Sequence, residues 1–133
     1  MRRKYFTLIA LFIAVAMTNI VQGQDKAATE IDKALNKMDA QLLAGWFNDR
    51  VDLETGSTTG NFSRNQAEVI MKEFFRDNPV SDFKLNHKGS SDGGSRYMVG
   101  SYLTRKGSRF RVYILLKKAG EELKIFEMQF EKE

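Results

Sequence analysis

The sequence predicts an α+β fold, in which a four-strand antiparallel meander and a small hairpin pack against an N-terminal helix and a second helix. Apolar residues recur every three or four positions over residues 25–47 and again over 63–78, as on helices that bury one side. From residue 80 onward, apolar and polar residues alternate in runs separated by Gly-bearing turns, which is typical of consecutive antiparallel strands. Because the helical and strand patterns occupy separate parts of the chain, the α+β class is favoured.

The N-terminus has the layout of a secretory signal. Basic residues at 2–4 precede an apolar run over 6–17, and the small residues Val21 and Gly23 follow at the expected cleavage position. The alternative is an uncleaved membrane anchor, but the apolar run is shorter than the roughly 20 residues that span a bilayer. We therefore predict a signal peptide at 1–23 and a single domain at 24–133 that is exported, periplasmic or secreted, with no membrane span after cleavage.

Charge and cysteine content exclude several classes of protein. The chain has 21 Lys and Arg against 17 Asp and Glu, a net charge of +4. Without Arg2, Arg3 and Lys4 the balance is 18 − 17, or +1, which gives no argument for nucleic-acid binding. The absence of Cys excludes disulfides and thiolate ligands. No phosphate-binding glycine loop or His-rich metal spacing occurs, so no cofactor and no metal are expected.

Local signals define the two helical regions. The first has an apolar stripe, and Asp39 within it suits a helix N-cap, so this region forms either one bent helix or two short ones. Ser63 and Gln66 form a capping-box pattern at the start of the second helix. Pro79 ends that helix, because the residue before a proline is disfavoured in the helical conformation. The stripe of the first region consists of Ile31, Leu35, Met38, Leu42 and Trp46.

The strand pattern also predicts a register. Residues 51–62 form a short peripheral hairpin, and the main strands begin near residues 80, 95, 109 and 121. An even loop at 105–108 sets Leu103 opposite Phe110 and Val99 opposite Ile114. An odd loop at the last turn sets Ile114 opposite Phe126. These registers place the following side chains beneath the helices: Val99, Val112, Ile114 and Phe126.

A resemblance to a known family rests on aromatic and glycine residues of the second helix and the strands. They are Phe74, Phe75 and Pro79, then Phe83, Leu85, His87 and Gly89, then Tyr97, Gly100, Tyr102 and Thr104, then Phe110, Arg111, Val112 and Tyr113. In these residues the chain resembles a domain-of-unknown-function family of small exported proteins of Bacteroidetes. That family has the nuclear-transport-factor-two-like, or cystatin-like, cone fold. The resemblance implies a long N-terminal helix cradled by a curved sheet, often with dimerisation through the outer sheet surface, and it implies no activity.

Candidate ligand-binding residues are Trp46, His87, Tyr97 and Ser101. His87 is the only histidine, and an imidazole can move a proton near neutral pH or ligate a metal. The alternative is a His at a strand end that is hydrogen-bonded to Tyr97 or to the loop backbone. The others either line the mouth of a small apolar pocket or belong to the core. No carboxylate is predicted on the covered face, so no catalytic residue is assigned.

The outer sheet face is predicted to be more apolar than a free surface requires. Its residues suit a homodimer interface, and the alternative is a solvated face with scattered apolar side chains. We therefore expect a non-catalytic exported module that binds a small apolar or amphipathic ligand or another protein. The wider superfamily implies an alternative, a lyase or isomerase of the dehydratase or ketosteroid-isomerase type that uses His87 in the concave pocket. The predicted interface residues are Met98, Tyr102, Arg111, Tyr113, Leu115, Ile125 and Glu127.

Overall fold

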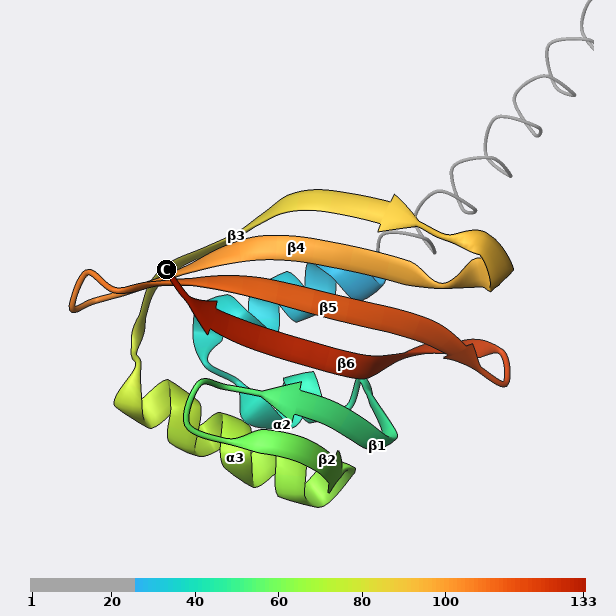
Figure 1. Ribbon diagram of the computed structural model, residues 1–133, viewed down its shortest axis with the longest axis horizontal. Helices are drawn as coiled ribbons and strands as arrows, with labels where there is room; N and C mark the ends of the chain where they lie inside the picture. The colour runs from blue at the N-terminus through green and yellow to red at the C-terminus, as the bar shows by residue number, and fades with distance from the viewer. Residues whose placement is uncertain (1–25) are drawn as a thin grey trace, which may run out of the picture.

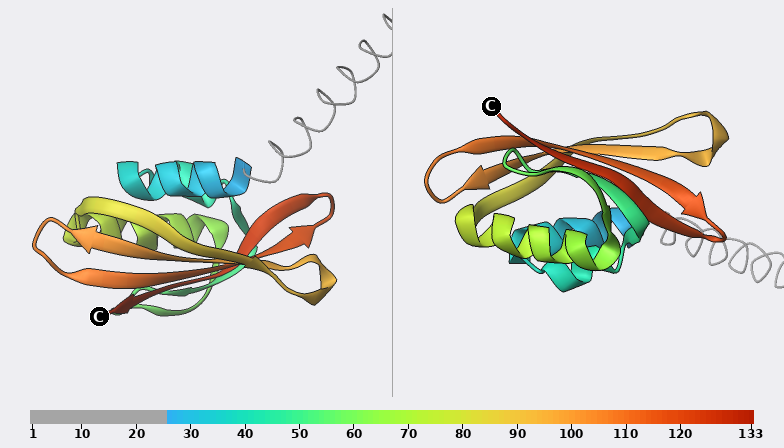
Figure 2. Two further views of the ribbon diagram at one scale, coloured as in Figure 1. Left: turned by 90° about the horizontal axis from the view of Figure 1, so that it is seen from above. Right: turned by 60° about the horizontal axis from the view of Figure 1, so that its bottom comes forward.

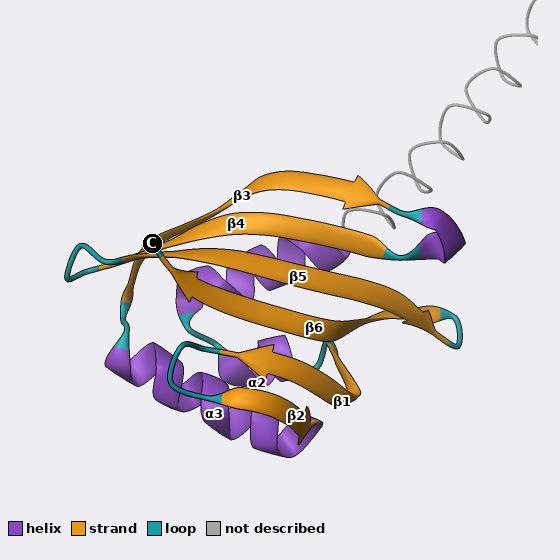
Figure 3. Ribbon diagram, viewed as in Figure 1, coloured by secondary structure: helices purple, strands orange, loops and turns teal. Residues whose placement is uncertain are grey.

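The computed structural model describes residues 26–133, so the predicted signal peptide lies outside the described residues. A six-stranded sheet carries the helices on one of its faces (Figures 1 and 2). The predicted α+β class is thereby confirmed, with strands and helices in separate layers (Figure 3). Within residues 26–133, no helix has the length and apolar character needed to cross a membrane.

The first helical region forms two helices. Residues 26–37 are helical, and Met38 then adopts a left-handed conformation with φ of 54°. The Asp39 N–H donates to the Ala34 carbonyl at 2.9 Å, which closes the helix C-terminus. Asp39 also caps the next helix, α2 (Ala40–Ala44), because its Oδ1 accepts from the Leu42 N–H at 3.0 Å. The predicted N-cap is confirmed, and the chain turns there instead of bending one helix.

The third helix, α3 (Arg64–Asp77), begins and ends as predicted. Ser63 and Gln66 make both hydrogen bonds of a capping box at its start. The helix ends at Asp77, two residues before Pro79. Its apolar side packs into the core through Ala67, Met71, Phe74 and Phe75.

The sheet contains the predicted hairpin and meander. Its strands are β1 (Phe47–Glu54), β2 (Thr59–Ser63), β3 (Val80–Ser90), β4 (Arg96–Thr104), β5 (Arg109–Ala119) and β6 (Glu122–Lys132). They lie in the order β2-β1-β6-β5-β4-β3. Every neighbouring pair is antiparallel except β1 and β6, which run parallel. This parallel pairing, absent from the prediction, attaches the small hairpin to the last strand.

The predicted register between β4 and β5 is wrong by one residue. Phe110 pairs with Tyr102 instead of Leu103, and Ile114 pairs with Met98 instead of Val99. The cause is a shorter loop: Thr104 bonds to Ser108, and Gly107 turns the chain with φ of 87°. Because side chains alternate between faces, a shift of one residue moves the whole strand's side chains to the opposite face.

The register between β5 and β6 differs from the prediction by two residues, so most faces are retained. Val112 pairs with Phe130 and Ile114 with Met128, and all of these side chains are buried as predicted. An irregularity in the pairing between Leu115 and Leu116 changes the alternation locally. Beyond it, Ile125 is buried in place of Phe126. The predicted burial of Val99 and Phe126 is therefore wrong, while that of Val112 and Ile114 is confirmed.

Aromatic rings fill the space between α3 and the sheet. The Phe74 ring centroid lies 4.4 Å from that of Phe130, 5.3 Å from that of Phe110 and 5.5 Å from that of Tyr102. The Tyr102 hydroxyl donates to the Asn78 carbonyl at 2.7 Å, and burial raises the pKa of this hydroxyl well above its ordinary value. A buried phenol with its hydrogen bond satisfied in this way belongs to the core.

The edge strand β3 is partly closed by the first helix. The Asn36 side chain donates to the Phe83 carbonyl at 3.0 Å and accepts from the Phe83 N–H at 2.9 Å. At the start of the same strand, the Arg105 backbone N–H donates to the Pro79 carbonyl and its Nε donates to the Val80 carbonyl. These groups take up backbone positions that an edge strand would otherwise leave unpaired.

Candidate functional site

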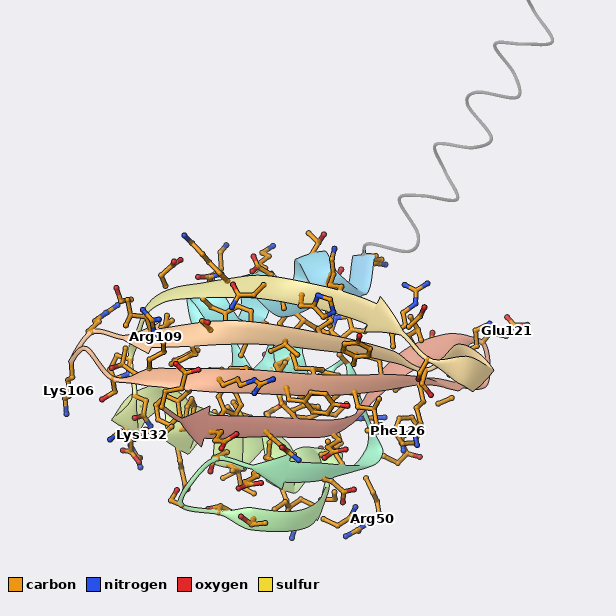
Figure 4. The ribbon with its side chains drawn as sticks, turned by 45° about the horizontal axis from the view of Figure 1, so that its top comes forward. Arg50, Lys106, Arg109, Glu121, Phe126 and Lys132 are labelled. Atoms are coloured by element: carbon orange, nitrogen blue, oxygen red, sulfur yellow. The ribbon has the colours of Figure 1, made fainter. Side chains whose placement is uncertain are left out.

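The candidate site is the sheet face that the helices leave uncovered, which we call the open face. Three strands supply its centre, and neighbouring side chains meet in the pairs Tyr97 with Leu115 and Val99 with Tyr113. These side chains are half-buried, although no described helix covers them. Figure 4 shows the sheet in front of the helices, with Phe126 of the same face labelled. We call the apolar part of this face the apolar band; it consists of Tyr97, Val99, Leu103, Tyr113, Leu115 and Phe126.

Carboxylates lie on one side of the apolar band. Asp52 and Glu54 on β1 and Glu127 on β6 border a shallow hollow of about 320 Å³ at the β1–β2 end of the sheet. Glu127 accepts a hydrogen bond from the Gln129 amide, and Asp52 accepts one from Asn61 at 2.7 Å. Arg50 lies on the same face of β1 and donates to Asn61, so this end of the open face carries one guanidinium group among its carboxylates.

Cations lie on the other side and within the band. Lys84 is exposed on β3 opposite Ser101, and Arg111 is exposed on β5 opposite the same serine. The Lys117 ammonium group lies 5.6 Å from the centroid of the Phe126 ring, within the range of a cation–π contact. On β3 the Asp82 Oδ2 lies 3.8 Å from the Lys84 Nζ, so this margin also carries a carboxylate. The apolar side chains of the open face thus lie between two margins that each carry both charges.

The structure does not bring the predicted ligand-binding residues into one cavity. His87 is exposed and lies with its Nε2 3.3 Å from the Tyr97 hydroxyl, which is the structural alternative considered for this histidine. The Ser101 hydroxyl accepts from the Asn86 amide at 2.8 Å on the same side of the sheet. Trp46 lies apart from them, at the end of α2, where its Nε1–H donates to the Glu30 Oε2 at 2.9 Å.

The predicted placement of Tyr97 and Ser101 under the helices is wrong because of the one-residue register shift in β4. An irregularity in the β3–β4 pairing between Leu85 and His87 likewise turns His87 away from the covered face. The alternative enzyme hypothesis loses its geometric basis, because it required His87 in the concave pocket. A role of these residues as ligand contacts stays a prediction.

The predicted interface residues divide into two groups. Arg111, Tyr113, Leu115 and Glu127 lie on the open face. Met98, Tyr102 and Ile125 are core residues instead, with exposed fractions of 4%, 0% and 0%. The register of β4 explains why Met98 and Tyr102 are buried, and the irregularity between β5 and β6 explains why Ile125 is buried. In their place the open face carries Tyr97, Val99, Leu103 and Phe126, which a glycine-closed turn at Gly107 would have indicated.

The covered interior offers no acid–base pair. Its buried polar side chains, within the described chain, are Thr55 and Thr104, and the Thr104 hydroxyl accepts from the Ser108 N–H. Among residues 26–133, no group of three or more His, Asp or Glu side chains could hold a metal ion.

Comparison with solved structures at low identity supports the fold. A domain of unknown function with a cystatin-like fold from Nostoc punctiforme shares 13% identity, covers 84% of this chain and 76% of its own, and has a TM-score of 0.64. An NTF2-like protein of unknown function from Shewanella baltica shares 9% identity, covers 87% and 95%, and has a TM-score of 0.63. No protein with a curated description matches the chain. The NTF2-like architecture implied by the strand residues is thereby confirmed.

More similar structures come from one family of unknown function. A DUF4783 family protein from Bacteroides ovatus is 31% identical over 78% of this chain and 93% of its own, with a TM-score of 0.72. A DUF4783 family protein from Bacteroides uniformis is 26% identical over 79% and 95%, with a TM-score of 0.73. The family model described as "Domain of unknown function (DUF4783)" matches residues 28–131, which is nearly all of the described chain. This chain therefore belongs to the DUF4783 family.

Proposed function

We propose that this protein is an exported, non-catalytic interaction module that forms a homodimer through the open face. The apolar band is the observation that carries the proposal: aromatic and aliphatic side chains stand next to one another across β4, β5 and β6. Contiguous apolar surface of this kind marks interaction sites in soluble proteins. Tyr and Arg, which anchor many protein interfaces, both occur on this face as Tyr97, Tyr113 and Arg111.

The charge distribution favours a second copy of the same chain as the partner. A two-fold axis that runs along the strands over β5 would set β1 of one copy opposite β3 of the other. The carboxylates of Asp52 and Glu54 would then approach Lys84 of the second copy. An axis across the strands would instead set carboxylates against carboxylates. The first arrangement pairs the carboxylates of β1 with a lysine of β3, and it also sets Arg111 of one copy opposite Arg111 of the other, because β5 lies on the axis.

The aromatic packing under α3 supports a non-catalytic function. In NTF2-like enzymes an active site would need space and an acid or base between helix and sheet. Here the rings of Phe74, Tyr102, Phe110 and Phe130 fill the space between α3 and the sheet. Export rests on the signal-like pattern at residues 1–23.

Light scattering on the purified protein tests the homodimer. We expect twice the monomer mass at micromolar concentration, and we expect Tyr113→Glu to weaken association at least about tenfold, since a buried carboxylate would face apolar side chains. Val69→Glu is the matched control, because Val69 is an apolar residue of α3 that is 53% exposed outside the open face.

Far-UV circular dichroism must show both variants folded. A monomer for the unsubstituted protein would overturn the proposal. An equal loss of association in both variants would also overturn it, because the open face would then have no special role.

A further inference from the structure

The covered face of the sheet changes character at its end next to the β3–β4 turn. Met98 and Leu116 are the last buried apolar residues there, with exposed fractions of 4% and 1%. Lys88 pairs with Met98, and Arg96 pairs with Leu116, so both cations continue the covered face beyond its apolar part. The pairing irregularity between Leu85 and His87 is what returns Lys88 to this face.

A cavity of about 270 Å³ lies at this place. Ala27 and Ala28 of the first helix form one apolar wall, and Met98, Leu116 and Leu123 of the sheet form the other. Lys88, Arg96 and the Ser90 side chain supply the polar part of the lining. Lys88 and Arg96 already interact with neighbouring groups in the structure, so a bound anion would join an existing polar arrangement.

We propose that this cavity binds a small amphiphile with one anionic headgroup and a short apolar tail, a free medium-chain carboxylate. The tail would contact the walls formed by Ala27, Ala28, Met98 and Leu116, which are buried, and by Leu123, which is half-buried. The carboxylate would accept charge-assisted hydrogen bonds from Lys88 and Arg96. The cavity lies at the small end of ligand sites, which measure roughly 300–1,000 Å³, so the tail must be short.

The surroundings oppose other ligand classes. A neighbouring hollow shares Ala27 and Leu123 with this cavity and is bordered by Glu30, Glu121 and Glu122. That hollow also carries Lys26 and Lys124, the latter 3.5 Å from Glu122, so its carboxylates outnumber its cations, whereas the charged side chains that line the cavity are Lys88 and Arg96. An anionic head is therefore directed toward Lys88 and Arg96. Most of this lining belongs to the covered face, opposite the proposed dimer interface, and Tyr97 is the residue that the cavity shares with the apolar band.

Isothermal titration calorimetry with decanoate tests the proposal. Decanol has nearly the same tail without the charge, acetate has the charge without the tail, and decyltrimethylammonium has the opposite charge. We expect decanoate to bind at least about tenfold more tightly than each of these. Amide chemical-shift changes should be largest at the residues that line the cavity.

Lys88→Gln and Arg96→Gln should each weaken decanoate binding about tenfold, the loss of one charge-assisted hydrogen bond. The matched control is Lys106→Gln, because Lys106 is an exposed lysine of the β4–β5 turn that lines neither this cavity nor the apolar band. Thermal unfolding must show that all three variants remain folded.

Several results would overturn the proposal: no detectable decanoate binding, equal binding of decanol, or equal weakening by all three variants. Binding to anionic phospholipid vesicles without binding of free decanoate would also overturn the proposal. Lys88 and Arg96 would then contact a membrane surface instead of a free carboxylate.

Discussion

The covered and open faces of the sheet are built from alternate residues of the same strands, yet only the covered face packs against helices. On β5, Val112, Ile114 and Leu116 are buried beneath helices, while Tyr113 and Leu115 between them are also apolar but have no described helix over them. A face that was exposed only to water would carry polar side chains at the positions of Tyr113 and Leu115. The covered face thus forms the core, and the open face is the surface to which we assign the proposed association.

The largest effect should come from the covered face. Phe74→Ala removes the ring at the centre of the aromatic cluster and should lower the free energy of unfolding by about 3–5 kcal/mol. Tyr113→Ala on the open face should cost less than about 1 kcal/mol within the monomer, because its ring packs on one side only. Urea unfolding, at a protein concentration low enough to keep the chain monomeric, measures the free energy of unfolding of both variants. Equal losses would remove the distinction between the faces.

A smaller effect is expected where the first helix meets the sheet edge. Asn36→Ala leaves the Phe83 N–H and carbonyl without their side-chain partner and should cost about 1–3 kcal/mol. Amide hydrogen exchange at Phe83 should accelerate. Asn86→Ala serves as the control, since this exposed amide bonds only to the Ser101 hydroxyl and should change stability by less than about 0.5 kcal/mol. Unchanged exchange in Asn36→Ala would show that the edge is closed by other groups.

The smallest effect is expected in the turn between β4 and β5, which sets the register and thereby which β4 side chains face the core. Gly107→Ala places a side chain at φ of 87° and should cost about 1 kcal/mol without exchanging the two faces. Lys106→Ala in the same turn should remain within about 0.5 kcal/mol of the unsubstituted protein. Chemical denaturation gives both values. If Gly107→Ala were neutral, the glycine would not be what selects the shorter loop.

Local signals in the sequence were sufficient for the elements themselves. The Asp39 cap, the Ser63 and Gln66 capping box and the stop at Pro79 each depend on neighbouring residues only, and all occur in the structure. The alternating runs likewise identified β3 to β6. The family and the NTF2-like fold followed from the aromatic and glycine pattern of these same strands.

The candidate site was harder to predict because it depends on register. Both faces of β4 are largely apolar, so hydrophobic pattern alone cannot choose between Val99 and Met98 as the buried residue. The choice depends on the left-handed conformation of Gly107. A glycine in the sequence permits this conformation but does not require it. The parallel pairing of β1 with β6 and the irregularity beside Leu116 join residues far apart in the chain, and no local pattern contains them.

The amide of Asn36 has a consequence for how copies of this protein can assemble. A bare strand edge is a template on which one chain after another can add without limit, the route to fibres. By occupying the backbone groups of Phe83, Asn36 blocks part of that route at β3. A two-fold pair through the open face, as proposed above, would leave no further site for a third copy and would stop at a finite size.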